Sequence, residues 1–155
     1  MAHNEITVEA SAANVWNVLA DGRNYGHWVV GSSEIREVEP GFPAPGTRFH
    51  HKVGWGPVKI ADHTAVLEAE PGRHLKLEAK ARPLGKALVT LELEEEFPGR
   101  TRILMEEDLP GDNLPVRVLN ALSAPLIKVR NAESLRRLKA IAEGRGPHPE
   151  ESAQP

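Results

Sequence analysis

The chain has 155 residues, a formal net charge of -3 and 40% hydrophobic residues, which fits one domain large enough to bury a core. It has no cysteine, so disulfides, thiol nucleophiles, zinc–thiolate sites and iron–sulfur clusters are excluded. The charge balance gives no broad electrostatic footprint for nucleic acid or an anionic membrane, and no apolar run approaches the roughly 20 residues of a membrane span. We therefore expect a cytoplasmic protein without nucleic-acid partners and without stable membrane insertion.

The N-terminal part of the chain predicts one strand and two short helices. Apolar and polar residues alternate over His3–Glu9, and this period of two is typical of a strand. A helix is predicted to begin at Ala12, because the hydroxyl of Ser11 can accept a hydrogen bond from a free N–H in the first turn. A second short helix is predicted over Asn24–Val30.

The middle of the chain predicts six further strands, separated by glycine- and proline-containing turns. These are Glu34–Glu39, Thr47–Val53, Pro57–Ala69, Arg73–Arg82, Lys86–Phe97 and Arg100–Leu109. Strands joined by short turns pair in the antiparallel sense, because parallel pairs need a long crossover.

The C-terminal part predicts one long helix over residues 113–143. Apolar residues at spacings of three and four predict one buried face, formed by Leu119, Leu122, Leu126 and Val129. Pro125 removes one backbone hydrogen bond, so we expect a bend there and an apolar stripe that continues on a shifted face. Residues 144–155, with three prolines and two glycines, are expected to be a disordered tail, which leaves residues 1–143 as a single domain.

The predicted fold is therefore α+β: a seven-stranded antiparallel sheet curved around the long C-terminal helix, with two short helices after the first strand. Because side chains alternate across a strand, each strand has one set that faces the helix. Around a hairpin turn between Gly54 and Pro57, we expect Phe49 opposite Asp62 and His51 opposite Ile60.

The helix-facing set contains several small residues, clustered near one end: Ala79, Ala81 and Ala87. A helix alone fills such a surface poorly, so we expect a pocket of roughly 300–1,000 Å³ between the sheet and the helix. The residues predicted to line it are Phe49, Val53, Ile60, Leu77, Ala79, Ala81, Val89, Leu91, Met105, Leu122 and Leu126.

Several strings along the chain are shared with a known group of proteins. They are Val15-Trp16-Asn17-Val18-Leu19, Tyr25-Gly26-His27-Trp28, Pro43-Ala44-Pro45-Gly46-Thr47, Gly99-Arg100-Thr101-Arg102, Glu106-Glu107-Asp108 and Arg130-Asn131-Ala132-Glu133-Ser134-Leu135. Over about His3 to Glu143 the chain thereby resembles the START-like, helix-grip superfamily and, within it, the polyketide cyclase/dehydrase-like proteins. The resemblance implies a ligand-binding domain whose cavity holds a lipid, polyketide or similar hydrophobic molecule, and some members of the group catalyse cyclisation or dehydration. The shared strings are architectural, so no catalytic residue is carried over.

His51 and Asp62 are the candidate catalytic pair. Both are predicted on the helix-facing side of adjacent strands, within side-chain reach. A carboxylate beside an imidazole fixes its tautomer and raises its basicity, as general acid–base catalysis requires. The same pair could instead form a structural hydrogen bond at the rim of the cavity.

Glu107 is predicted on an otherwise apolar face, where a carboxylate needs a cationic partner or a raised pKa. Arg130 on the long helix is the candidate partner, and the ion pair could anchor a polar ligand group or tie the helix to the sheet. His51 is expected to point away from His50 and His63, so three metal ligands do not converge and neither a metal nor another cofactor is expected.

The sequence favours a protein that binds a hydrophobic small molecule between sheet and helix, as a monomer or homodimer. The alternative is a cyclase- or dehydratase-type enzyme in which His51 is the general base. A third hypothesis is an interaction module that binds a protein partner on the outward face of the sheet.

Overall fold

The structure, a computed structural model, describes residues 2–30, 32–55, 58–80, 86–110 and 113–144, with only the backbone described for 32–34, 53–55 and 58–60. One seven-stranded sheet has the order β1-β7-β6-β5-β4-β3-β2, and every pair of neighbours is antiparallel. Its strands are β1 (Ala2–Val8), β2 (Ser32–Val38), β3 (Arg48–Trp55), β4 (Val58–Glu70), β5 (His74–Lys80), β6 (Lys86–Phe97) and β7 (Arg100–Asp108).

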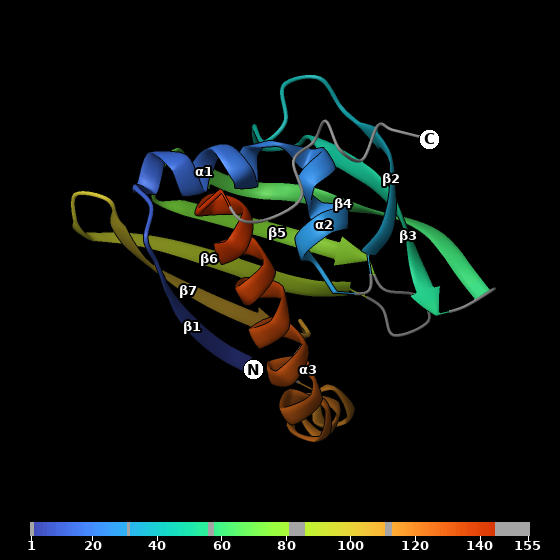
Figure 1. Cartoon of the computed structure of the whole chain (residues 1–155). Helices are drawn as coiled ribbons and strands as arrows, with labels where there is room; N and C mark the ends of the chain where they lie inside the picture. The colour runs from blue at the N-terminus through green and yellow to red at the C-terminus, as the bar shows by residue number, and fades with distance from the viewer. Residues whose placement is uncertain (1, 31, 56–57, 81–85, 111–112, 145–155) are drawn as a thin grey trace.

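The helices lie on the concave face of this sheet (Figure 1). They are α1 (Ala12–Ala20), the 3-10 turn η1 (Gly22–Asn24), α2 (Tyr25–Trp28) and α3 (Leu114–Ala142). Side chains cap the two longer helices: Ser11 accepts from the N–H of Asn14, as predicted, and Asn113 accepts from the N–H of Val116. The predicted α+β fold, with its seven strands and long C-terminal helix, is confirmed.

The pairing of β3 with β4 differs from the prediction by two residues. His51 faces Asp62 and Phe49 faces Thr64, so the expected pairs of Phe49 with Asp62 and His51 with Ile60 are wrong. The reason is that the end of the hairpin lies one residue later in the chain than expected, because the last pair is Trp55 with Val58 and not Gly54 with Pro57. A shift of two residues preserves the side on which each residue lies, so the predicted helix-facing set is kept.

The apolar core occupies one end of the concave face, where α1, α2 and the second half of α3 cover the sheet. Its most buried members are Val8, Val15, Leu19, Tyr25, Trp28, Leu75, Leu91, Ile103, Leu135 and Leu138. The Tyr25 hydroxyl is satisfied inside this core by donating to the Leu19 carbonyl over 2.8 Å. Burying one such aliphatic or aromatic side chain is worth about 1.5–3 kcal/mol, so this end of the sheet holds the helices in place.

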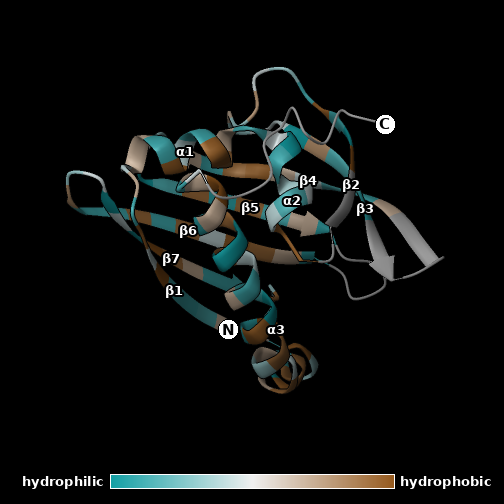
Figure 2. Ribbon diagram, viewed as in Figure 1, coloured by the Kyte–Doolittle hydropathy of each residue, from teal (hydrophilic) through white to brown (hydrophobic). Residues whose placement is uncertain are grey.

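The first half of α3, by which we mean residues 114–131, differs from its prediction. The expected buried face of Leu119, Leu122, Leu126 and Val129 is instead exposed, with Leu122 and Leu126 at 76% and 75%. The side that turns to the sheet carries Asn120, Ala124, Ile127 and Asn131, at spacings of four, three and four. Figure 1 shows the first turns of α3 at the bottom of the view, beyond the sheet, and Figure 2 shows that they carry hydrophobic residues.

Some sequence predictions fall outside the described residues. Ala81 and residues 145–155, most of the predicted tail, belong to this group, and the side chains of Val53 and Ile60 are not described. Within the described part of the chain, no helix is both long and apolar enough to cross a membrane.

Candidate functional site

A row of paired residues, two of them alanines, crosses the concave face beside the packed core. Phe49 pairs with Thr64, Thr64 with Ala79, and Ala79 with Ala87, so these four residues follow one another across β3, β4, β5 and β6. Ala87 is buried and Ala79 is half-buried. We call Ala79 and Ala87 the alanine floor; a methyl group at each position leaves more space above the sheet than a leucine would.

A buried polar cluster lies at the β3–β4 end of this floor. His51, Asp62 and Thr64 are each no more than 5% exposed, and all three come from the helix-facing side of their strands. Nε2 of His51 is 3.0 Å from Oγ1 of Thr64, whereas Nδ1 has no hydrogen-bond partner among the described residues. The ring therefore bonds Thr64 rather than Asp62, although Asp62 stands directly opposite.

Burial controls the charge state of this histidine. Desolvation lowers the pKa of His51 from its ordinary value of 6.5, and this effect outweighs the opposing influence of the Asp62 carboxylate. The imidazole is consequently neutral at neutral pH. A neutral ring that already uses Nε2 can offer Nδ1 to a ligand, as donor or acceptor according to its tautomer.

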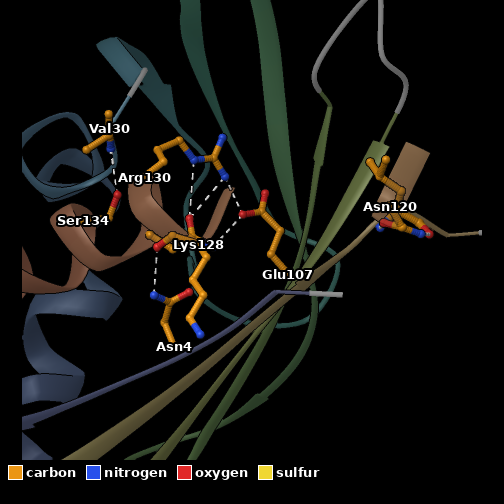
Figure 3. A network of polar contacts seen from close by, with 9 residues as sticks. Asn4, Val30, Glu107, Asn120, Lys128, Arg130 and Ser134 are labelled. Atoms are coloured by element: carbon orange, nitrogen blue, oxygen red, sulfur yellow. Dashed lines mark hydrogen bonds and ion pairs between the residues drawn. The ribbon is translucent and has the colours of Figure 1, made fainter. Parts of the chain in front are cut away.

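A second polar cluster lies on β7 and α3 (Figure 3). The buried carboxylate of Glu107 forms an ion pair with the guanidinium of Arg130, and its Oε2 also accepts from Nδ2 of Asn131 at 2.8 Å. The Arg130 guanidinium in turn donates to Oδ1 of Asn131 at 3.2 Å. The ion pair predicted from the sequence is thus present, and Asn131 completes it, because a buried carboxylate needs more than one partner.

Two further contacts hold the first half of α3 beside this cluster. The side chain of Asn120 accepts from the N–H of Leu109 and donates to its carbonyl, both at 3.1 Å. On the other side, Asn4 of β1 donates to the backbone carbonyl of Lys128 at 2.9 Å (Figure 3). These polar contacts fix α3 at the edge of the sheet without burying its leucines.

The predicted site residues separate into several groups. Leu77, Leu91 and Met105 are buried in the apolar core, and Phe49 packs there against the ring of Tyr25. Val89 is half-buried and pairs with Glu107. Leu122 and Leu126 do not lie over the sheet, because the opposite side of α3 faces it.

Two polar residues near these clusters, Thr64 and Asn120, were absent from the predicted site, and Asn131 was predicted to hydrogen-bond a ligand or a backbone carbonyl rather than Glu107. The signal for the two asparagines was available, because Asn120, Ala124, Ile127, Asn131 and Leu135 recur at helical spacings. Reading only the strongest apolar stripe hid this second, mixed stripe.

Two surface hollows lie elsewhere on the described part of the chain. One, of about 610 Å³, is on the convex side near His74, whose ring is hydrogen-bonded by both Glu68 and Glu92. The other, of about 510 Å³, runs between β1 and α3 beside Val129 and Leu135. Among the described residues, no three histidine, aspartate or glutamate side chains converge to hold a metal ion.

The geometry, a curved antiparallel sheet closed by a C-terminal helix, defines a helix-grip protein. A model of the family described as polyketide cyclase / dehydrase and lipid transport matches residues 2–143. The chain belongs to this family, which confirms the resemblance of its sequence motifs. A comparison with curated proteins finds no match.

Solved structures share the fold at low sequence identity. Protein NE0264 from Nitrosomonas europaea is 15% identical with a TM-score of 0.63, over 92% of this chain and 95% of that one. DynU16, a protein of the dynemicin biosynthetic locus, is 18% identical with a TM-score of 0.65, over 94% of this chain and 48% of its own. The di-domain ARO/CYC StfQ from the steffimycin biosynthetic pathway is 12% identical with a TM-score of 0.66, over 92% and 50%. This chain spans about half the length of the last two.

Proposed function

We propose that the protein binds an elongated, mostly apolar small molecule across the alanine floor, between the sheet and the first half of α3. The observation that supports this most strongly is the pair of buried polar clusters at the two ends of a surface lined by small side chains. Four strand spacings of about 4.8 Å separate β3 from β7, so the clusters stand on the order of 20 Å apart along the sheet. A ligand that reaches both would be extended and polar near its ends.

Each cluster has the chemistry to orient such a ligand. Nδ1 of His51 is a buried polar atom that lacks a partner among the described residues, and a ligand hydroxyl or carbonyl would remove that cost. At the other end, Arg130 is 41% exposed while it is paired with Glu107, so its guanidinium can donate further hydrogen bonds to a carbonyl or carboxylate. Contact with Ala79, Ala87 and Val89 would supply affinity at about 25 cal/mol per Å² of apolar surface buried.

The test compares two alanines of the same sheet. Ala79→Leu fills the floor, whereas Ala61→Leu adds the same side chain at an exposed position of β4. With a fluorescent fatty acid as the probe, we expect Ala79→Leu to weaken binding more than tenfold and Ala61→Leu to leave it unchanged. Equal affinity of the two variants would place the ligand elsewhere.

The second candidate function, a cyclase- or dehydratase-type enzyme, is supported by the neutral imidazole of His51. A buried, uncharged ring with Nδ1 available has the form that a general base requires. Native mass spectrometry of material purified with the wild type and with His51→Ala distinguishes the two functions. A carrier retains the same small molecule in both proteins. An enzyme releases product from the wild type and accumulates substrate in the variant. For a dehydration, that substrate is heavier than the product by one water.

A further inference from the structure

The first half of α3 presents an apolar stripe that nothing in the described structure covers. Leu114, Val118, Leu122, Leu126 and Val129 recur at spacings of four, four, four and three, so they share one side of the helix. Their exposed fractions are 70%, 47%, 76%, 75% and 71%. Isolated exposed leucines need no explanation, but a contiguous stripe of five over four turns indicates an interaction surface.

The charges around this stripe have one sign. Between Asn113 and Ala132 the sequence has three basic residues, Arg117, Lys128 and Arg130, and no acidic residue. Arg130 is paired with Glu107, but the structure describes no ion pair for Arg117 or Lys128, which follow one edge of the stripe. The acidic residues in the adjoining groove have cationic partners: Glu5 is 3.4 Å from Arg102, which it shares with Glu94, and Glu133 pairs with Arg136 and Arg137.

We propose that this side of α3 docks on an anionic lipid surface, with the stripe in the interfacial region and Arg117 and Lys128 at the headgroups. An amphipathic helix of this kind lies in the plane of the interface, and long basic side chains can bury their stems while the charges stay wet. The near-neutral average of the whole chain conceals this local positive charge. Docking is peripheral and needs no membrane-spanning segment.

A second copy of the chain fits this surface less well. In a two-fold antiparallel pairing the same edge of the stripe meets in both copies, so Arg117 and Lys128 of both copies gather along one side of the contact. Four like charges would lie along that side. An anionic surface instead attracts every cation at the stripe.

Vesicle sedimentation tests the proposal directly. We expect the full-length protein to bind phosphatidylcholine vesicles that contain phosphatidylglycerol, to bind pure phosphatidylcholine vesicles weakly, and to be released by high salt. Leu122→Ser/Leu126→Ser should weaken binding more than tenfold. Arg117→Gln/Lys128→Gln should weaken it about 25-fold, because each cation near an anionic surface contributes about fivefold.

Matched controls use the same substitutions at other exposed positions. Leu67→Ser/Phe97→Ser removes two exposed apolar side chains of the sheet, and Arg23→Gln/Arg73→Gln removes two exposed cations; both variants should bind like the wild type. Because the chain has no cysteine, a nitrobenzoxadiazole label can be placed at Leu122→Cys or at Phe97→Cys. Only the label at position 122 should shift its emission to the blue on anionic vesicles.

The proposal is overturned if the wild type does not sediment with anionic vesicles, or if the leucine and control variants bind equally well. It is also overturned if sedimentation velocity finds a dimer that Leu122→Ser/Leu126→Ser dissociates while vesicle binding is absent. In that case the stripe is the interface with a second copy. These outcomes do not depend on whether a small molecule binds at the alanine floor.

Discussion

The two halves of α3 are attached to the same sheet by different means. In the second half, Leu135 and Leu138 are fully buried in the core, and Ser134 accepts from the N–H of Val30 at 3.0 Å. In the first half, Asn120 bonds the backbone of Leu109 just after β7, and Arg130 and Asn131 bond Glu107 of β7. The large apolar side chains of this half point to solvent. Apolar burial therefore anchors one half, and hydrogen bonds position the other.

This difference indicates how the molecule divides its tasks. A helix end held by well-packed leucines is costly to move, because each leaves a cavity when it is removed. An end held by a few partly exposed polar contacts is cheaper to displace. The proposed ligand site and the proposed lipid-docking stripe both lie at the first half of α3, which is the more weakly held one.

The largest expected effect on stability comes from shortening one leucine side chain to alanine in each half of α3. Leu138→Ala removes a fully buried side chain and should lower the free energy of unfolding by about 2–5 kcal/mol. Leu122→Ala removes the same atoms from an exposed position and should change it by no more than about 0.5 kcal/mol. Urea denaturation measures both. Similar losses in the two variants would mean that the first half of α3 is packed as the second half is.

Next in size is the loss of the cation that pairs with Glu107. Arg130→Met leaves the buried carboxylate with Asn131 but without its counter-charge, so we expect a loss of about 1–3 kcal/mol in the free energy of unfolding. The control is Arg137→Met, which removes an exposed ion pair with Glu133 one to two turns away and should cost about 0–1 kcal/mol. If the two variants are equally stable, the Glu107 cluster does not hold α3.

A comparable but more local effect is expected from Asn120→Ala. The substitution removes two hydrogen bonds to the backbone of Leu109, worth about 0.5–1.5 kcal/mol each. Hydrogen exchange should become faster over residues 114–130 and stay unchanged around Leu135. Uniform acceleration along all of α3 would contradict the division of the helix into two halves.

The smallest effects are on the pH dependence of stability. They come from two histidines, one with a pKa set by burial and one with a pKa set by paired carboxylates. Burial lowers the pKa of His51, so the unfolded chain binds more protons and its contribution to stability falls as the pH drops below 6.5. Partial burial also lowers the pKa of His74, but hydrogen bonds and charges of Glu68 and Glu92 outweigh it and raise the net value. The contribution of His74 is therefore full below pH 6.5 and is lost as the pH rises through its folded pKa.

Thermal unfolding over a pH series checks these opposite signs. As the pH falls, the stability of His51→Asn relative to the wild type should rise. The stability of His74→Asn relative to the wild type should fall. Parallel curves for the two variants would show that neither residue has the shifted pKa described above.

Much of the architecture followed from local patterns in the sequence. Period-two alternation located the first strand, and glycine- and proline-containing turns delimited the other six. Ser11 marked the start of α1, and Glu107 among apolar neighbours indicated a cationic partner that the structure supplies as Arg130. The side of the strands on which His51 and Asp62 lie was also predicted, although their register was shifted by two residues. Period two protects the face of a strand from such an error.

The sequence by itself determined the elements, their order and the helix-facing side of each strand, because these depend on neighbours within a few positions. Only the tertiary structure decided which side of α3 meets the sheet, that His51 bonds Thr64 rather than Asp62, and that Asn120 reaches Leu109. The first half of α3 has one apolar and one mixed stripe, and hydrophobicity alone selects the apolar one. Contacts between residues distant in the chain selected the mixed stripe. Glu107 and the backbone of Leu109 need hydrogen-bond partners, which the two asparagines of the mixed stripe provide and leucines could not.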